Sequence, residues 1–155
     1  MSRLDLRGIP VLGGTGYPVP FHEAVAGRTR QALGAAGGLT QFGVNLVELQ
    51  PGAASSQRHW HSCEDEFVTI ISGELVLITD EGETIMRAGE HAAFPAGVAD
   101  AHHLVNRSRE PGVFLAVGSR NNADVVTYPD VDLRYEQASN AYLHTDGTPY
   151  PKRGT

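Results

Sequence analysis

The stretch of sequence that decides the fold is RHWHSCEDE, residues 58–66. It places His59 and His61 two positions apart, with Glu66 five residues after the second histidine. In an extended strand the side chains at i and i+2 lie on the same face, so the two imidazoles point the same way. A turn after His61 would bring Glu66 beside them on the neighbouring strand. The spacing therefore predicts that two imidazoles and a carboxylate converge on one metal ion.

A third imidazole follows in the segment GVADAHHLVN, residues 97–106, which offers His102 or His103. Imidazole nitrogens with a carboxylate oxygen suit Mn, Fe, Co, Ni, Cu or Zn, whereas Mg and Ca prefer sites made of oxygen alone. Three histidines and one glutamate leave coordination positions open on an octahedral ion, and substrates bind at open positions. We therefore expect one divalent transition metal per chain.

Length and composition predict a single domain, because 155 residues with 41% hydrophobic content are enough to fill one core. The formal net charge is -6 and Arg28, Arg30, Arg107 and Arg109 are scattered pairs, so we expect no nucleic-acid surface. No window approaches the roughly 18 apolar residues of a membrane span, and the N-terminus is charged where a signal peptide needs an apolar core. Cys63 is the only cysteine, which fits a reducing compartment. We expect a soluble, cytoplasmic protein.

Short apolar runs between glycines and prolines predict an all-β barrel or sandwich. The expected strands are residues 42–49, 66–71, 74–79, 83–87, 91–94, 102–106 and 113–117. The tight turn at Ser72 and Gly73 predicts a hairpin between the second and third of these. Seven or more short strands without intervening helices favour a closed or sandwiched antiparallel sheet.

The two ends of the chain differ from this middle part. Residues 1–38 are expected to form an N-terminal arm, with an extended part at 8–20 and one short helix within 22–36. Residues 39–127 are expected to form the barrel. Residues 128–155, which carry several tyrosines and prolines, are expected to form an irregular tail packed on the barrel.

Two motifs resemble those of the cupin superfamily. The first family motif runs Gly, His-x-His, three or four residues, Glu, six residues, Gly, and its counterparts here are Gly52, His59-Trp60-His61, Glu66 and Gly73. The second runs Gly, five residues, Pro-x-Gly, His, three residues, Asn, and it looks like Gly89, Pro95-Ala96-Gly97, His102 and Asn106. The resemblance implies a double-stranded β-helix, the cupin jelly-roll barrel, from about residue 40 to 120.

The family pattern also bears on the choice between the two adjacent histidines. An insertion relative to the family pattern separates Gly97 from the histidine, so His102 and His103 are both alternatives. The spacing to Asn106 selects His102, and strand alternation then places His102 and Leu104 inside the barrel and His103 outside. The metal ligands that the resemblance implies are His59, His61, Glu66 and His102.

The wider chain looks like small bacterial single-domain cupins of a metal-binding, sugar-phosphate-isomerase-like group. Related cupins commonly form dimers through N-terminal arms, so the resemblance implies a homodimer to which residues 1–38 contribute. Three residues are candidates for the substrate pocket. Gln57 shares the interior face with His59 and could bind a ligand or simply lie at the barrel mouth, and Asn106 and His103 lie near the third ligand.

Three functions remain open, because the cupin fold hosts many activities. The first is metal-assisted isomerisation, epimerisation or dehydration of a small chelating substrate such as a sugar, a sugar phosphate, or a hydroxy or keto acid. Its general base could be His103, Glu48 or a metal-bound hydroxide. The second is an Fe(II)-dependent dioxygenase with the same ligands. The third is a non-catalytic protein that binds or senses a small molecule.

Overall fold

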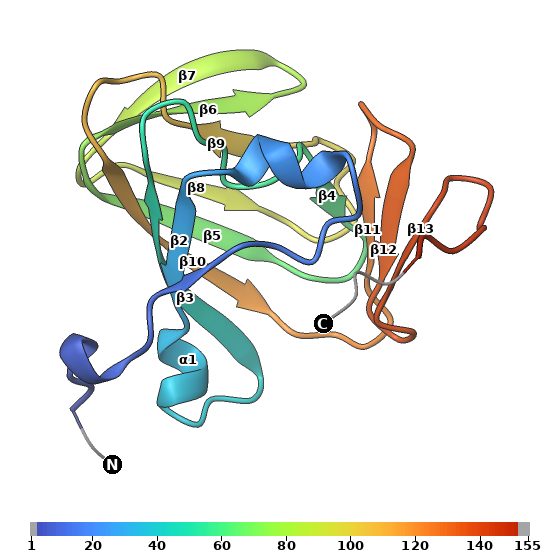
Figure 1. Cartoon of the computed structure of the whole chain (residues 1–155), viewed down its shortest axis with the longest axis horizontal. Helices are drawn as coiled ribbons and strands as arrows, with labels where there is room; N and C mark the ends of the chain where they lie inside the picture. Colours follow the sequence, from blue (N-terminus) through green and yellow to red (C-terminus); the bar gives the residue numbers. More distant parts are fainter. Residues whose placement is uncertain (1–2, 152–155) are drawn as a thin grey trace.

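The computed structural model describes residues 3–151 of the chain (Figure 1). Its strands are β1 (Leu12–Gly13), β2 (Arg28–Gln31), β3 (Phe42–Leu49), β4 (Trp60–His61), β5 (Glu66–Ser72), β6 (Glu74–Thr79), β7 (Gly82–Arg87), β8 (His91–Phe94), β9 (His103–Val105), β10 (Gly112–Ser119), β11 (Val125–Tyr128), β12 (Leu133–Glu136) and β13 (Ala141–Leu143). Its helical elements are the 3-10 helices η1 (Leu6–Gly8) and η2 (Phe21–Val25) and the α-helix α1 (Leu33–Ala36). The predicted all-β class is confirmed, and β3, β6 and β8 have the predicted bounds.

The strands form three antiparallel sheets. A six-stranded sheet runs β1-β2-β3-β10-β5-β8, a three-stranded sheet runs β7-β6-β9, and a four-stranded sheet runs β13-β12-β11-β4. In Figure 1 the three-stranded sheet lies above the six-stranded one, with β11, β12 and β13 to one side of both. Among residues 3–151, no helix is long and apolar enough to cross a membrane.

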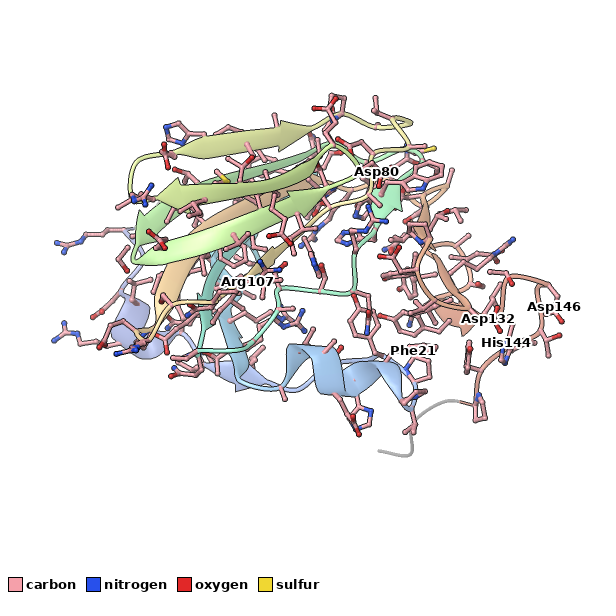
Figure 2. All side chains as sticks on the ribbon, turned by 90° about the horizontal axis from the view of Figure 1, so that it is seen from above. Phe21, Asp80, Arg107, Asp132, His144 and Asp146 are labelled. Carbon is pink, nitrogen blue, oxygen red and sulfur yellow. The ribbon has the colours of Figure 1, made fainter. Side chains whose placement is uncertain are left out.

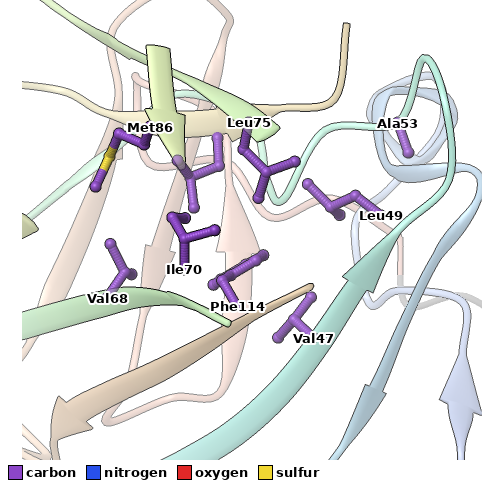
Figure 3. Close-up of a cluster of buried hydrophobic side chains, with 9 residues drawn as sticks. Val47, Leu49, Ala53, Val68, Ile70, Leu75, Met86 and Phe114 are labelled. Carbon is purple, nitrogen blue, oxygen red and sulfur yellow. The ribbon is translucent and has the colours of Figure 1, made fainter. Parts of the chain in front are cut away.

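The main core lies between the six-stranded and the three-stranded sheet (Figure 3). Eight of its buried residues come from the two sheets and are Val47, Leu49, Val68, Ile70, Leu75, Met86, Leu104 and Phe114. The ninth, Ala53, comes from the loop after β3. The alternation of inward and outward side chains along a strand explains this selection. In β5, Ile70 is 1% exposed whereas its neighbour Ile71 is 51% exposed. Strand β5 therefore contributes every second side chain, Val68 and Ile70, to the core.

The predicted hairpin at Ser72 and Gly73 is wrong. Strand β5 pairs with β10 and β8, whereas β6 pairs with β7 and β9, so the turn carries the chain from one sheet to the other. Gly73 has a φ of +78°, and a Cβ there would lie 2.8 Å from the carbonyl oxygen of Pro111. Only glycine fits such a corner without displacing the backbone that it crosses. A hairpin forms instead at the next turn, between β6 and β7.

The N-terminal segment contains less helix than the sequence predicts. The range 22–36 holds the end of η2 and the four-residue α1, and strand β2 lies between them. This strand pairs with β3 and extends the six-stranded sheet at its edge. The free backbone edge of β3 explains the difference, because pairing there satisfies N–H and C=O groups that an isolated helix of this length would hold only weakly.

The C-terminal residues are also more regular than predicted. Strands β12 and β13 follow β11 in the four-stranded sheet, which has β4 at its other edge. A second core lies there and consists of Tyr17, Val25, Val126, Tyr128 and Leu133. Figure 2 shows Phe21 of η2 close to this end of the molecule. Aromatic side chains from both ends of the chain therefore supply the apolar area that orders the tail.

The neighbours Ile70 and Ile71 test which face of β5 forms the core. We expect Ile70→Ala to lower the free energy of unfolding by about 2–5 kcal/mol, because it leaves a cavity between the two sheets. Ile71→Ala removes the same atoms from an exposed position and should cost less than about 1 kcal/mol. Urea unfolding followed by circular dichroism measures both. Equal losses would contradict the assignment of the core face.

Candidate metal centre

Backbone pairing brings three histidines to one place. His59 and His102 form an antiparallel bridge, in which each backbone N–H donates to the other carbonyl at 3.1 and 2.9 Å. Residues paired in this way project their side chains to the same face. His61 lies two residues further along and pairs with Val126 of β11, so its side chain shares the face of His59.

Glu66 supplies the carboxylate at the start of β5. Its Oε2 atom lies 2.8 Å from Nε2 of His102, 3.4 Å from Nε2 of His59 and 3.5 Å from Nε2 of His61. One carboxylate oxygen therefore faces three imidazole nitrogens. All four residues that the family resemblance implies as ligands meet, and the adjacent His103 is not among them.

The outer nitrogen of each imidazole faces an acceptor. Nδ1 of His59 donates to the carbonyl oxygen of Gln57 at 2.9 Å, and Nδ1 of His61 lies 2.7 Å from the Asp124 carboxylate. Nδ1 of His102 lies 3.4 Å from the carbonyl oxygen of Asp100. Because the Glu66 carboxylate can only accept, Nε2 of His102 donates to it in this structure. With the Nδ1 proton held by its acceptor, loss of the Nε2 proton would free a lone pair that points toward the centre, which is how histidines that bind metals are held. The donor set therefore fits a transition-metal ion.

The electrostatics of the cluster centre on Glu66. Burial alone would raise the pKa of Glu66, but the hydrogen bonds with His102 and His59 outweigh it and hold this pKa well below the usual range. Burial likewise opposes the charged form of His59, yet the neighbouring carboxylate raises the pKa of His59 overall. Glu66 is therefore ionised at neutral pH and attracts a cation into the cluster.

Asp124 contacts the cluster, and sequence reasoning missed it. It is 2% exposed, and its Oδ1 accepts hydrogen bonds from the backbone N–H of Cys63 at 2.8 Å and the hydroxyl of Ser62 at 3.2 Å. Its Oδ2 faces His61, so Asp124 fixes the orientation of that imidazole. It lies beyond both family motifs, and only the register between β4 and β11 brings it here.

A cavity of about 240 Å³ opens beside the cluster, and His59, Glu66 and His102 form part of its wall. His103 also lines it, although strand alternation predicted that its side chain lies outside the barrel. The Nδ1 atom of His103 lies 2.9 Å from the carbonyl oxygen of Ser56. Because that oxygen can only accept, Nδ1 of His103 donates.

The two other pocket candidates do not line this cavity. The side-chain amide of Gln57 donates to the carbonyl oxygen of Phe21 at 3.0 Å and so ties the N-terminal segment to the barrel. Asn106 is fully buried, and its Nδ2 donates to the carbonyl oxygens of Leu49 and Glu110 at 2.8 Å. Both amides are used to hold loops, which corrects their assignment to the pocket.

Glu48, one of the candidate bases, is also directed away from the cavity. It lies on β3 between the buried residues Val47 and Leu49, so strand alternation places its side chain on the opposite face. Its carboxylate accepts a hydrogen bond from the amide of Gln50 at 2.7 Å. Glu48 is therefore excluded as a base acting in this cavity.

Comparison with known proteins identifies the class to which this fold and this cluster belong. The family model for the cupin domain matches residues 45–118. A solved structure described as a sugar phosphate isomerase from a cupin superfamily, from Silicibacter pomeroyi, is 45% identical, with a TM-score of 0.91, and the alignment covers 99% of this chain and 100% of that chain. The chain belongs to the cupin superfamily, and its barrel is the predicted jelly roll.

Other solved structures extend the comparison. A putative sugar phosphate isomerase from Acidithiobacillus ferrooxidans is 29% identical, with a TM-score of 0.71, and 81% of each chain is covered. A polyketide cyclase from Streptomyces resistomycificus is 21% identical, with a TM-score of 0.60, over 77% of this chain and 79% of that chain, and this likeness concerns the fold alone. A comparison with curated proteins finds no match.

The role of Asp124 can be tested by Asp124→Asn in the metal-free protein. An amide has one acceptor oxygen, which stays with Cys63 and Ser62, and its NH₂ group then faces His61. His61 must accept through Nδ1 and carry its proton on Nε2, the nitrogen that points into the cluster. We expect long-range ¹H–¹⁵N spectra to show this change of tautomer.

The matched control is Asp132→Asn, at the position that Figure 2 shows beside His144. Asp132 also accepts from a backbone N–H and a hydroxyl, both of Thr145, and faces Nδ1 of His144 at 2.7 Å, but its side chain is 54% exposed. This variant should leave the His61 signals unchanged. An unaltered His61 tautomer in Asp124→Asn would show that Asp124 does not orient the ring.

Proposed function

We propose that this cupin is a metal-dependent enzyme that isomerises or epimerises a small oxygenated substrate, with a sugar phosphate as the first candidate. The observation that carries the proposal is the convergence of three Nε2 atoms on the Glu66 carboxylate in the wall of a cavity. The similarity to a protein described as a sugar phosphate isomerase supports this choice of reaction.

In this proposal His59, His61, Glu66 and His102 hold one divalent transition metal, with Zn, Mn, Fe, Ni and Co as candidates. Such an ion polarises a carbonyl group and makes the neighbouring C–H bond more acidic. The size of the cavity suits a small substrate, because about 240 Å³ lies below the range of about 300–1,000 Å³ for drug-sized ligands. Apolar side chains of Val47, Leu104 and Phe114 line it and limit access of water.

We propose His103 as the residue that accepts the substrate proton. It lines the same cavity as the cluster, and its Nδ1 atom donates to Ser56. A neutral imidazole with its proton on Nδ1 has a free lone pair on Nε2, as a general base requires. Of the two side chains that the sequence suggested for this role, His103 faces the cavity and Glu48 does not.

Metal content tests the ligand assignment. We expect protein purified under anaerobic conditions to hold about one transition-metal ion per chain by elemental analysis, as a site of four protein ligands should. His59→Ala/His61→Ala removes two of the four ligands and should reduce the content to background. His91→Ala/His144→Ala removes two histidines outside the cluster and should leave it unchanged. Equimolar metal in the first double variant would rule out the ligand assignment.

Solvent exchange tests the reaction. We expect metal-loaded protein in D₂O to incorporate deuterium at the carbon beside the carbonyl of an aldose or ketose phosphate, because enolisation releases that proton to the base. Glu66→Gln should slow this exchange by at least about 100-fold, since it removes a ligand rather than a supporting group. Absence of exchange across a panel of sugar phosphates would favour a binding protein. Oxygen uptake by iron-loaded protein with diols or diketones would favour a dioxygenase.

A further inference from the structure

We propose that Arg28 and Arg30 bind an oxyanion group of the substrate, a phosphate or a carboxylate, in the cavity that also contains the metal cluster. In this arrangement the oxyanion group of the substrate lies at the arginines and its other end lies at the cluster. The placement of that other end rests on the function proposed above. The anion site itself stands on the placement of these two arginines, their lack of ion-pair partners and the shape of the surface around them.

The placement follows from the register of β2 on β3. Arg30 pairs with Val47 and Arg28 pairs with Leu49, both of which are core residues. Directly opposed residues in an antiparallel pair project to the same face, so the arginines point into the barrel rather than to its outer surface. Both line the cavity with His59 and Glu66. Charged residues on the interior face of a strand are unusual unless they have a partner or a ligand.

Neither arginine has a carboxylate partner within residues 3–151. Arg28 donates to the carbonyl oxygens of Ser55 and Gly14, and Arg30 donates to the side-chain oxygen of Asn45. These acceptors are neutral and use only some of the five N–H donors of each guanidinium. Arg58 provides the contrast, because it forms ion pairs with Asp80 and Asp130.

The electrostatic environment favours an anion at this place. Burial lowers the pKa of Arg28, and repulsion from Arg30 acts in the same direction, so the protein alone does not stabilise the charged form of Arg28. Within the described part of the chain, Glu66 is the one carboxylate that lines the cavity, and it is engaged with the histidines. An oxyanion ligand would therefore supply the missing negative charge.

The surface provides space for such a group. A polar groove of about 420 Å³ is lined by residues 13–17 together with Arg28, Arg30 and Tyr142. Tyr17 and both arginines line this groove and the cavity, so the guanidinium groups lie where the two hollows meet. A planar guanidinium matches the oxygens of phosphate and carboxylate through paired hydrogen bonds. A substrate with an anionic end at the arginines would place its other end toward the cluster.

The test uses metal-free protein, so that an anion cannot bind through a metal. Inorganic phosphate and acetate are titrated separately into ¹⁵N-labelled protein, and the side-chain Nε–Hε signals of arginine are followed by NMR. We expect saturable shifts of the Arg28 and Arg30 signals with at least one of the two anions. Tighter binding of phosphate would indicate a phosphate ester as the substrate, and tighter binding of acetate would indicate a carboxylate.

Arg30→Gln is the decisive variant, because Arg30 is exposed and its change should not affect folding. We expect it to weaken anion binding by about tenfold or more, which corresponds to the loss of a charge-assisted hydrogen bond. Arg109→Gln removes the same charge from an exposed position that does not line the cavity and should bind like the wild type. Arg28→Lys keeps the positive charge but loses the paired N–H donors of the guanidinium. It should weaken anion binding less than Arg30→Gln does.

The proposal is overturned if wild-type protein binds neither anion, if Arg30→Gln binds as the wild type does, or if Arg109→Gln is weakened equally. These outcomes are separate from those of the metal proposal. Arg30→Gln should keep its full metal content, and loss of metal from the His59→Ala/His61→Ala protein should leave binding of the anion at the arginines unchanged.

Discussion

The arrangement of the site depends on the pair of backbone hydrogen bonds between His59 and His102. These bonds join the segment before β4 to the segment before β9, and they connect the four-stranded sheet with the three-stranded one. The neighbouring bonds from Ser55 to Leu104 and from Gly52 to Asn106 continue the same pairing. This irregular pairing of backbone segments closes the barrel and sets two imidazoles side by side.

Glu66 reaches this pair from the opposite sheet, where β5 lies between β8 and β10. The cluster therefore sits at a junction where the positions of all sheets are already determined by hydrogen bonds and by the core. Because folding already brings the four side chains together, metal binding does not have to supply the free energy needed to assemble them. This arrangement also explains why a carboxylate can remain ionised there, since three imidazoles surround it before any cation binds.

The sequence could predict the parts of this site that depend on local spacing. The alternation of side chains along an extended chain predicted that His59 and His61 share a face, and the spacing to Asn106 separated His102 from His103. It could not predict contacts that depend on long-range register. Asp124 meets His61 only because β11 pairs with β4, and Arg28 and Arg30 meet the cavity only because β2 pairs with β3.

The same distinction applies to the fold. Apolar runs between glycines predicted the positions of the central strands, because these depend on local pattern. The turn at Gly73 looked like a hairpin because its local chemistry is that of a hairpin, and only the backbone of Pro111 shows that it is a corner between sheets. The regular strands of the tail depend on apolar partners from the other end of the chain, which no window of sequence contains.

Strand β2 lies outside residues 45–118, the part of the chain that the family model recognises. The cupin core holds the four clustered residues, whereas the two arginines come from a segment that precedes it. A barrel with this layout can acquire a new preference for its ligand when the strand next to the edge of its sheet is replaced and its cluster remains intact. Homologous barrels that share the three histidines and the glutamate but differ in the segment before the cupin core are therefore expected to bind different molecules. Sequence comparison of those N-terminal segments is the direct way to classify them.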